Sequence, residues 1–134
     1  MARVVGVGGI FFKCDDPQKQ RQWYREHLGL NTDDYGTNFI SRLESNPEVR
    51  SYLQWSPFQR DSTYFPGQMM VNYRVDNLEA LLAELASSGI TLVGEVQKEV
   101  YGIFAHVSDP EGNLIELWQP NEAEYDKIVE GRTF

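Results

Sequence analysis

The feature that most constrains the fold of this chain is an order of elements that occurs twice. Three short matches keep the same order in both halves: residues 11–17 (FFKCDDP) with 72–78 (NYRVDNL), 35–36 with 101–102 (YG), and 55–57 (WSP) with 118–120 (WQP). Each match is weak alone, but three in one order indicate a duplicated unit of strand, helix and further strands. Since each helix must cover one face of its strands, the two opposite faces can form a shared concave surface.

Start and stop signals mark the helix of each unit. Asp16 is placed to cap a helix over residues 17–28, with a proline in its first position and Gly29 at its end. Asp76 or Asn77 is placed to cap a second helix over 78–88, which ends at Gly89. Two helices are therefore predicted, one early in each unit.

The apolar spacing of each helix predicts what it packs against. The first helix is expected to lay Trp23 and Leu28 on Ile10 and Phe12 of the first strand. The second is expected to lay its leucines on the strand that precedes it, with the contacts Leu81, Leu82 and Leu85 on Val71 and Tyr73. Strands are predicted over residues 4–14, 35–43, 50–56, 69–75, 91–96, 103–107 and 114–118.

The last two strands form a hairpin that contains an unusual carboxylate. Asp109 opens a tight turn that ends at Asn113, and alternation after it places Leu114, Glu116 and Trp118 on one face. A carboxylate between two large apolar neighbours needs a partner. Three partners are possible: Arg74 or Lys13 in an ion pair, the positive group of a bound ligand, or a metal ion. In each case Glu116 is expected to face the cleft.

The chain has only two histidines and one cysteine that could take part in catalysis or metal binding. His106 could lie across the hairpin from Glu116, but the turn does not fix the register. A half-buried, hydrogen-bonded histidine is the simpler interpretation, and Cys14, on the core face of its strand, is expected to be a small buried hydrophobe. The single cysteine excludes an intrachain disulfide and suits a reducing, cytoplasmic location.

Composition excludes several classes of partner. The chain has 134 residues, which suits one domain, and a net charge of −8. That charge disfavours nucleic acid and anionic membranes and favours a cationic ligand. No apolar run reaches transmembrane length, and the N-terminus lacks a signal-peptide pattern.

The sequence resembles the vicinal oxygen chelate superfamily, which includes glyoxalase I, bleomycin-resistance proteins and extradiol dioxygenases. Three segments resemble it: WYREHLGL (23–30), VDNLEALLAELASSGI (75–90) and DPEGNLIELW (109–118). The resemblance implies an α+β fold with two tandem βαβββ modules, about 1–60 and about 68–120, in a curved mixed sheet around a cleft. A tail follows over 121–134 as a short helix or a lid. The resemblance also implies a homodimer, which would cover apolar surface around an open cleft.

The superfamily's enzymes hold a divalent metal on side chains from four strands. By resemblance these positions fall at Gly9, near Gln54, at Met70 and at Glu116, although the match of the two tryptophan motifs would place Leu53 opposite Glu116. Gly9 has no side chain and Met70 is a poor ligand for hard metals. No bound cofactor is therefore predicted, and a divalent metal, if present, would use Glu116 and Gln54.

Two functions remain open at this point. The first is metal-free binding of a small planar or cationic molecule, as in the bleomycin-resistance branch; the second is a metal-dependent lyase, isomerase or dioxygenase of the glyoxalase type, with Glu116 as base or ligand. Aromatic residues Trp55, Phe58, Tyr64 and Phe65 are available to stack on a planar ligand, although a long loop needs such anchors in any case. The residues predicted to contact the ligand are Glu116, Trp118, Leu114, Met70, Asn72, Arg74, Phe11, Gln54 and Trp55.

Overall fold

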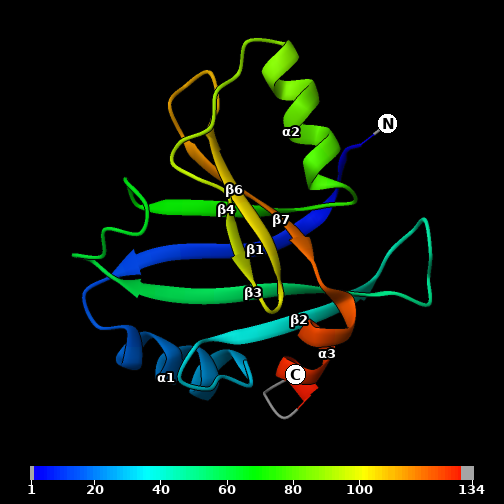
Figure 1. Ribbon diagram of the computed structural model, residues 1–134. Coiled ribbons are helices and arrows are strands. Elements are labelled where there is room, and N and C mark those ends of the chain that lie inside the picture. Colours follow the sequence, from blue (N-terminus) through cyan, green and yellow to red (C-terminus); the bar gives the residue numbers. More distant parts are fainter. Residues whose placement is uncertain (1, 131–134) are drawn as a thin grey trace.

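The computed structural model describes residues 2–130, which form one curved, unclosed mixed sheet with three helices. The elements in chain order are β1 (Val4–Cys14), α1 (Pro17–Leu28), β2 (Thr37–Arg42), β3 (Arg50–Gln59), β4 (Met69–Val75), α2 (Leu78–Ser87), β5 (Gln97–Glu99), β6 (Gly102–Ser108), β7 (Leu114–Pro120) and α3 (Glu122–Glu130). The seven strands lie in the order β2-β3-β1-β4-β7-β6-β5. Figure 1 shows α1 and α2 at opposite ends of the molecule, with the strands between them. The predicted α+β, glyoxalase-like fold is confirmed.

The two units meet at the centre of the sheet. β1 pairs with β4 in antiparallel register, and each of them has a parallel neighbour from its own unit, β3 beside β1 and β7 beside β4. The second unit supplies four strands as expected. The first supplies three, because after α1 the chain makes only an isolated bridge between Asp33 and Gly36 before it enters β2.

One predicted strand is wrong in position. Residues 91–96 form no strand, and the edge strand β5 is the three-residue segment Gln97–Glu99 that follows. The reason lies at Gly94, whose φ of 77° is incompatible with extended backbone. The apolar side chains that suggested a strand are largely exposed, for example Val93 at 46%.

Helix α1 has the predicted bounds but buries a different edge. Asp16 accepts a hydrogen bond from the backbone of Lys19, and Gly29 ends the helix in the left-handed conformation. Trp23 and Leu28 are 51% and 58% exposed, so the prediction that they pack on the sheet is wrong.

The contact between α1 and the sheet is made through Tyr24 instead. The Tyr24 ring lies 4.7 Å from that of Trp55 on β3, and the Trp55 ring lies 5.2 Å from that of Phe12 on β1. Because α1 packs against β3 as well as β1, its buried edge is centred on Tyr24. The Trp23 ring packs on the helix itself, beside the rings of Tyr24 and His27.

Helix α2 closes a hydrophobic core on the same side of the second unit. Asn77 is its N-cap, and Leu81, Leu82 and Leu85 pack against a cluster that includes Val75 and Leu117. Tyr73 packs there too, as predicted, whereas Val71 is only partly buried and lies outside the cluster.

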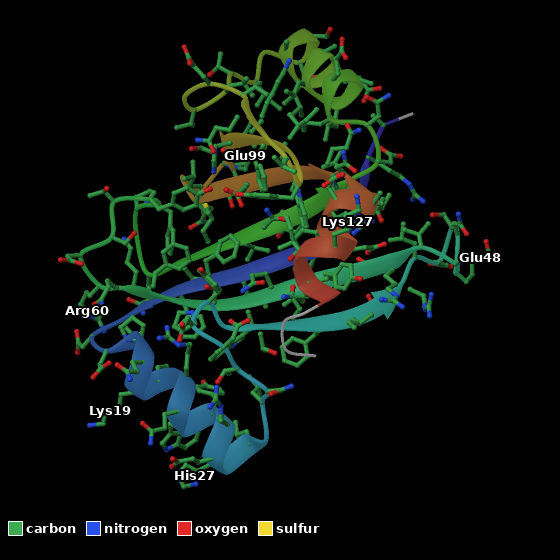
Figure 2. All side chains as sticks on the ribbon, turned by 60° about the horizontal axis from the view of Figure 1, so that its bottom comes forward. Lys19, His27, Glu48, Arg60, Glu99 and Lys127 are labelled. Carbon is green, nitrogen blue, oxygen red and sulfur yellow. The ribbon has the colours of Figure 1, made fainter. Side chains whose placement is uncertain are left out.

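The tail forms α3, which lies across the other side of the sheet. Tyr125 and Val129 of α3 join a second core cluster with Tyr52 of β3 and Trp118 of β7. In Figure 2, Arg60 marks the loop after β3 and Lys127 marks α3, and the strands run between them. Residues 131–134 of the predicted tail lie outside the described residues. No helix within residues 2–130 combines the length and the apolar character needed to cross a bilayer.

Candidate functional site

The side of the sheet opposite α1 and α2 contains a cavity of about 500 Å³. Its walls are mostly aromatic, and the rings come from β1, β3, β6, β7, α3 and the loops before β2, after β3 and before β6: Phe11, Tyr35, Phe58, Tyr64, Tyr101, Phe104, Trp118 and Tyr125. Gly8, Gln54, Ser56, Asn72 and Glu116 complete the lining. These residues come from both units, so the cavity lies between the two units.

Glu116 is the one charged residue among the described residues that line the cavity, and it is 1% exposed. Its carboxylate accepts hydrogen bonds from Asn72 Nδ2 at 2.7 Å and from the hydroxyl of Tyr64. Nε2 of His106 lies 2.8 Å from Oε2 of the same carboxylate. Because a carboxylate only accepts, Nε2 carries the hydrogen in this contact.

The predicted ion pair between Glu116 and Arg74 or Lys13 is therefore wrong. Arg74, 3% exposed, is directed to Glu122 at the start of α3. Lys13 donates from Nζ to the carbonyl oxygen of Phe65 at 2.6 Å, in the loop that precedes β4. Both cations have their own partners, and the negative charge of Glu116 is instead balanced by three hydrogen-bond donors.

The hairpin register brings His106 to Glu116. The two residues are directly opposite in the antiparallel pair of β6 and β7. Asp109 fixes this register, because its carboxylate accepts hydrogen bonds from the backbone of Glu111 and of Asn113, and from the Asn113 side chain. The sequence left this pairing open, and the structure resolves it.

Tyr64 closes the cavity over Glu116 from the loop between β3 and β4. Its ring stacks on Phe58 with centroids 5.9 Å apart and meets the ring of His106 edge-on at the same distance. Burial raises the pKa of the Tyr64 phenol far above its usual range, and the charge of Glu116 raises it further. Tyr64 is therefore neutral at physiological pH and can donate its hydroxyl hydrogen to Glu116.

Of the residues predicted to contact a ligand, five line the cavity: Phe11, Gln54, Asn72, Glu116 and Trp118. Four lie elsewhere. Trp55 faces α1, because its neighbours Gln54 and Ser56 face the cavity and side chains alternate along β3. Arg74 is turned to α3, Met70 is buried outside the lining (1% exposed), and Leu114 is partly buried outside it.

The placement of Trp55 also decides between Gln54 and Leu53. Trp118 lines the cavity whereas Trp55 faces the helix, so the match of the two tryptophan motifs is one residue out of step. Gln54 is level with Gly9 in the sheet, and Gly9 is level with Asn72, which is level with Glu116. It is therefore Gln54, not Leu53, that shares the cavity face with Glu116.

Several lining residues were missed by the sequence analysis. Phe104 could have been found, since it pairs directly with Trp118 across the hairpin and their rings stack with centroids 5.7 Å apart. Tyr35 and Tyr101 belong to the repeated Tyr-Gly pair but were given no role there. Tyr125 has no local signal, because only the docking of α3 brings it to the cavity.

The residues present do not fit the four-ligand metal site of the superfamily's enzymes. No group of three or more His, Cys, Asp and Glu side chains within residues 2–130 is arranged to hold a metal. Gly9 offers no ligand, and the carboxylate oxygens of Glu116 already accept hydrogen bonds from Asn72, Tyr64 and His106. A metal at Glu116 would have to displace these donors.

The sequence model of the Glyoxalase/Bleomycin resistance protein/Dioxygenase superfamily matches residues 7–117, so the chain belongs to this superfamily. No curated protein sequence matches the chain.

Solved structures with the same fold include enzymes. Methylmalonyl-CoA epimerase from Mycobacterium tuberculosis is 21% identical with a TM-score of 0.59, and the match covers 87% of this chain and 89% of that one. The Mn(II)-bound glyoxalase from Novosphingobium aromaticivorans is 16% identical with a TM-score of 0.59, covering 89% of this chain and 40% of that one. A superfamily member from Vibrio splendidus 12B01 is 16% identical with a TM-score of 0.51, covering 89% and 99%. At these identities the likeness is one of fold.

Proposed function

We propose that the protein binds a small planar cation in the aromatic cavity, with the Glu116 carboxylate facing the positive group and without a metal. The observation that supports this most is the arrangement of eight aromatic rings around one buried carboxylate. Aromatic faces attract cations, and a carboxylate on the floor of an apolar cavity provides the opposite charge. The net charge of −8 adds a long-range attraction for a cation at low salt.

Tyr64 is the donor that a ligand would replace on Glu116. Asn72 and His106 are buried on strands, whereas Tyr64 belongs to a loop and is 42% exposed. Moving a loop residue disturbs fewer packed contacts than moving a strand, so the Tyr64 hydroxyl is the one that gives way. The ligand's positive group would then bond to the oxygen that Tyr64 leaves, and the Tyr64 ring would cover the ligand.

The test is a thermal-shift and calorimetric titration with benzamidinium as the planar cation and neutral benzamide as its matched control, both without added metal. A ligand at 100 times its Kd stabilises a protein by about 2.7 kcal/mol, which raises Tm by roughly 10 °C in a domain of this size. Benzamidinium is expected to raise Tm, and benzamide is not.

Two variants distinguish the effect of the Glu116 carboxylate on binding from the effect of the net charge of the protein. Glu116→Gln removes a charge-assisted hydrogen bond and is expected to weaken benzamidinium binding by about 10- to 100-fold. Glu84→Gln on α2 makes the same change in net charge at an exposed position and is expected to bind as the wild type does. Equal binding of benzamidinium and benzamide, or equal loss in both variants, would contradict the proposal.

The second candidate is a metal-dependent lyase, isomerase or dioxygenase of the glyoxalase type, with Glu116 as base or ligand. The hydrogen-bonded pair of His106 and Glu116 beside the cavity favours it, since such a pair is suited to proton transfer. The measurement that favours this candidate over binding is elemental analysis of dialysed protein. One zinc, nickel, manganese or iron per subunit that is lost in Glu116→Ala, together with turnover of a thiol adduct or a catechol, would replace the binding proposal.

We also propose that the protein is a cytoplasmic homodimer. Supporting the dimer is a series of exposed apolar side chains along the segment that leads into and follows edge strand β5: Ile90, Leu92, Val93, Val96 and Val100. Apolar surface beside an unpaired strand edge suits association with a second copy. Light scattering at micromolar concentration tests it, and a monomer would contradict it. The buried free thiol of Cys14 fits a reducing compartment.

A further inference from the structure

Three buried amide atoms on the cavity side of the sheet have no hydrogen-bond partner within residues 2–130. They are Nδ2 of Asn38, Oε1 of Gln54 and Oδ1 of Asn72. Each of these side chains uses its other amide atom: Asn38 Oδ1 accepts from Tyr125, Gln54 Nε2 donates to the Tyr35 carbonyl, and Asn72 Nδ2 donates to Glu116. Buried polar atoms without partners are few in folded proteins, so three on one face require a physical account.

These atoms belong to one line of residues that crosses six strands. Successive neighbours in the register of the sheet are Asn38, Gln54, Gly9, Asn72, Glu116 and His106. Only Gly9, at the centre, has no side chain. The ring of Phe11 lies over it, because a Cβ built on Gly9 would be 2.8 Å from Cζ of Phe11, so Gln54 and Asn72 flank this ring. Since strands lie about 4.8 Å apart, the backbones of these two residues are about 10 Å apart across it.

The unpartnered groups on either side of the Phe11 ring are acceptors. Oε1 of Gln54 lies on one side. Oδ1 of Asn72 lies on the other, over Gly8, and belongs to the amide whose Nδ2 donates to Glu116. Gln54, Asn72 and Glu116 all line the cavity. Two amide oxygens of the cavity floor therefore have no donor, and they lie on either side of the Phe11 ring, on which a flat ligand can stack.

We propose that the ligand is a flat aromatic cation that carries N–H donors at both ends of its ring. This inference rests on the proposed binding function and narrows it. A primary ammonium or amidinium at one end donates to Glu116 and to Oδ1 of Asn72, and an N–H group at the other end donates to Oε1 of Gln54. A quaternary ammonium has no N–H and would leave both amide oxygens without partners, which is unfavourable in a buried site.

The experiment compares three probes of similar size on the wild-type protein by isothermal titration calorimetry. 4-Aminobenzamidine has N–H donors at both ends, benzamidine has them at one end, and phenyltrimethylammonium has the charge but no N–H. We expect 4-aminobenzamidine to bind about fivefold tighter than benzamidine, as one neutral hydrogen bond gives, and phenyltrimethylammonium to bind at least about tenfold weaker than benzamidine.

A variant of Gln54 tests whether its Oε1 accepts the hydrogen bond from the second N–H group of the ligand. Gln54→Met keeps the length of the side chain and removes Oε1, so 4-aminobenzamidine and benzamidine should bind this variant equally. Gln59→Met, at the exposed end of the same strand, is the matched control and should keep the fivefold difference. The wild-type series needs no variant, so the inference remains testable if Gln54→Met fails to fold.

The outcomes separate this inference from the proposed function. If no probe binds, or if binding does not depend on Glu116, the proposed function fails. If all three cations bind with similar affinity in a Glu116-dependent way, the proposed function stands and the N–H requirement is wrong. If the fivefold gain of the amino group persists in Gln54→Met, Gln54 is not its acceptor and the two-ended arrangement is wrong.

Discussion

Gly8 of β1 provides a sharp test of how the cavity floor is packed. A Cβ built on Gly8 would lie 2.9 Å from Cε3 of Trp118 and would overlap Oδ1 of Asn72. The nearest atom to a Cβ built on Gly6, two residues earlier on the same strand, is Oγ of Ser51 at 3.8 Å, an ordinary contact. Gly8→Ala and Gly6→Ala are therefore the same substitution on one strand in two different environments.

Comparing Gly8→Ala with Gly6→Ala isolates the contribution of packing at Gly8 to the free energy of unfolding. Replacing glycine by alanine stabilises a protein by about 0.4–1 kcal/mol through the unfolded chain, and this gain is common to both variants. Overpacking at Gly8 is expected to cost about 1–3 kcal/mol, because neither the Trp118 ring nor the Asn72 amide can move freely on a closely packed floor. Gly6→Ala should be neutral or slightly stabilising. The free energy of unfolding of Gly8→Ala should be about 1–3 kcal/mol lower than that of Gly6→Ala.

Equilibrium unfolding in urea measures this difference directly. Both variants should keep the m-value of the wild type, so that the shift in midpoint reports a change in stability alone. A difference below about 0.5 kcal/mol, the usual range for an uncrowded surface site, would refute the packing of Trp118 and Asn72 over Gly8. An altered m-value would show that the substitution changes the extent of folding.

Three further predictions concern other parts of the molecule. Hydrogen bonds from Asn113 lower the pKa of Asp109, so its contribution to stability is present above about pH 4 and is lost as pH falls through the lowered pKa. Asp109→Asn should therefore have a lower Tm than the wild type at pH 7, and this difference in Tm should shrink as the pH falls through the lowered pKa. A difference independent of pH would contradict this. Burial raises the pKa of the Cys14 thiol, so iodoacetamide should label it far more slowly in the folded protein than in urea, and equal rates would count against a buried thiol. Glu122→Gln leaves Arg74 buried without a carboxylate and should destabilise the protein by about 1–3 kcal/mol in urea unfolding. The loss should be smaller than for a fully buried pair, because the Glu122 side chain is 40% exposed. A change under about 0.5 kcal/mol would contradict this.

The sequence predicted the bounds of an element well where they depend on residues with a single structural role, such as capping or ending a helix. Asp16, a proline in the first turn and Gly29 fixed the bounds of α1, since capping and chain termination depend on nearby atoms only. The buried edge of α1 was mispredicted, because Trp23, Tyr24 and Leu28 all fit an apolar stripe. Only the position of the helix over both β1 and β3 selects Tyr24.

The site was predictable in its centre and less so at its borders. Strand alternation placed Glu116 and Trp118 on one face of β7, and the structure has both in the cavity lining. The partners of Glu116 depend on how strands from distant parts of the chain align, so the sequence favoured charged residues where the structure has Asn72 and His106. Trp55 illustrates the same limit, because a match between repeats one residue out of step reverses the face of every side chain on a strand.

Helix α3 ties the two units together, and this has a consequence for the order in which the protein is completed. Tyr125 and Asp126 of α3 bond to Asn38 and Tyr52 of the first unit, while Glu122 pairs with Arg74 of the second. Because α3 follows both units in the chain, the wall that Tyr125 supplies is synthesised after both of them. A nascent chain that has already paired its seven strands would still have an open cavity, and it would gain its full binding surface only when this helix docks.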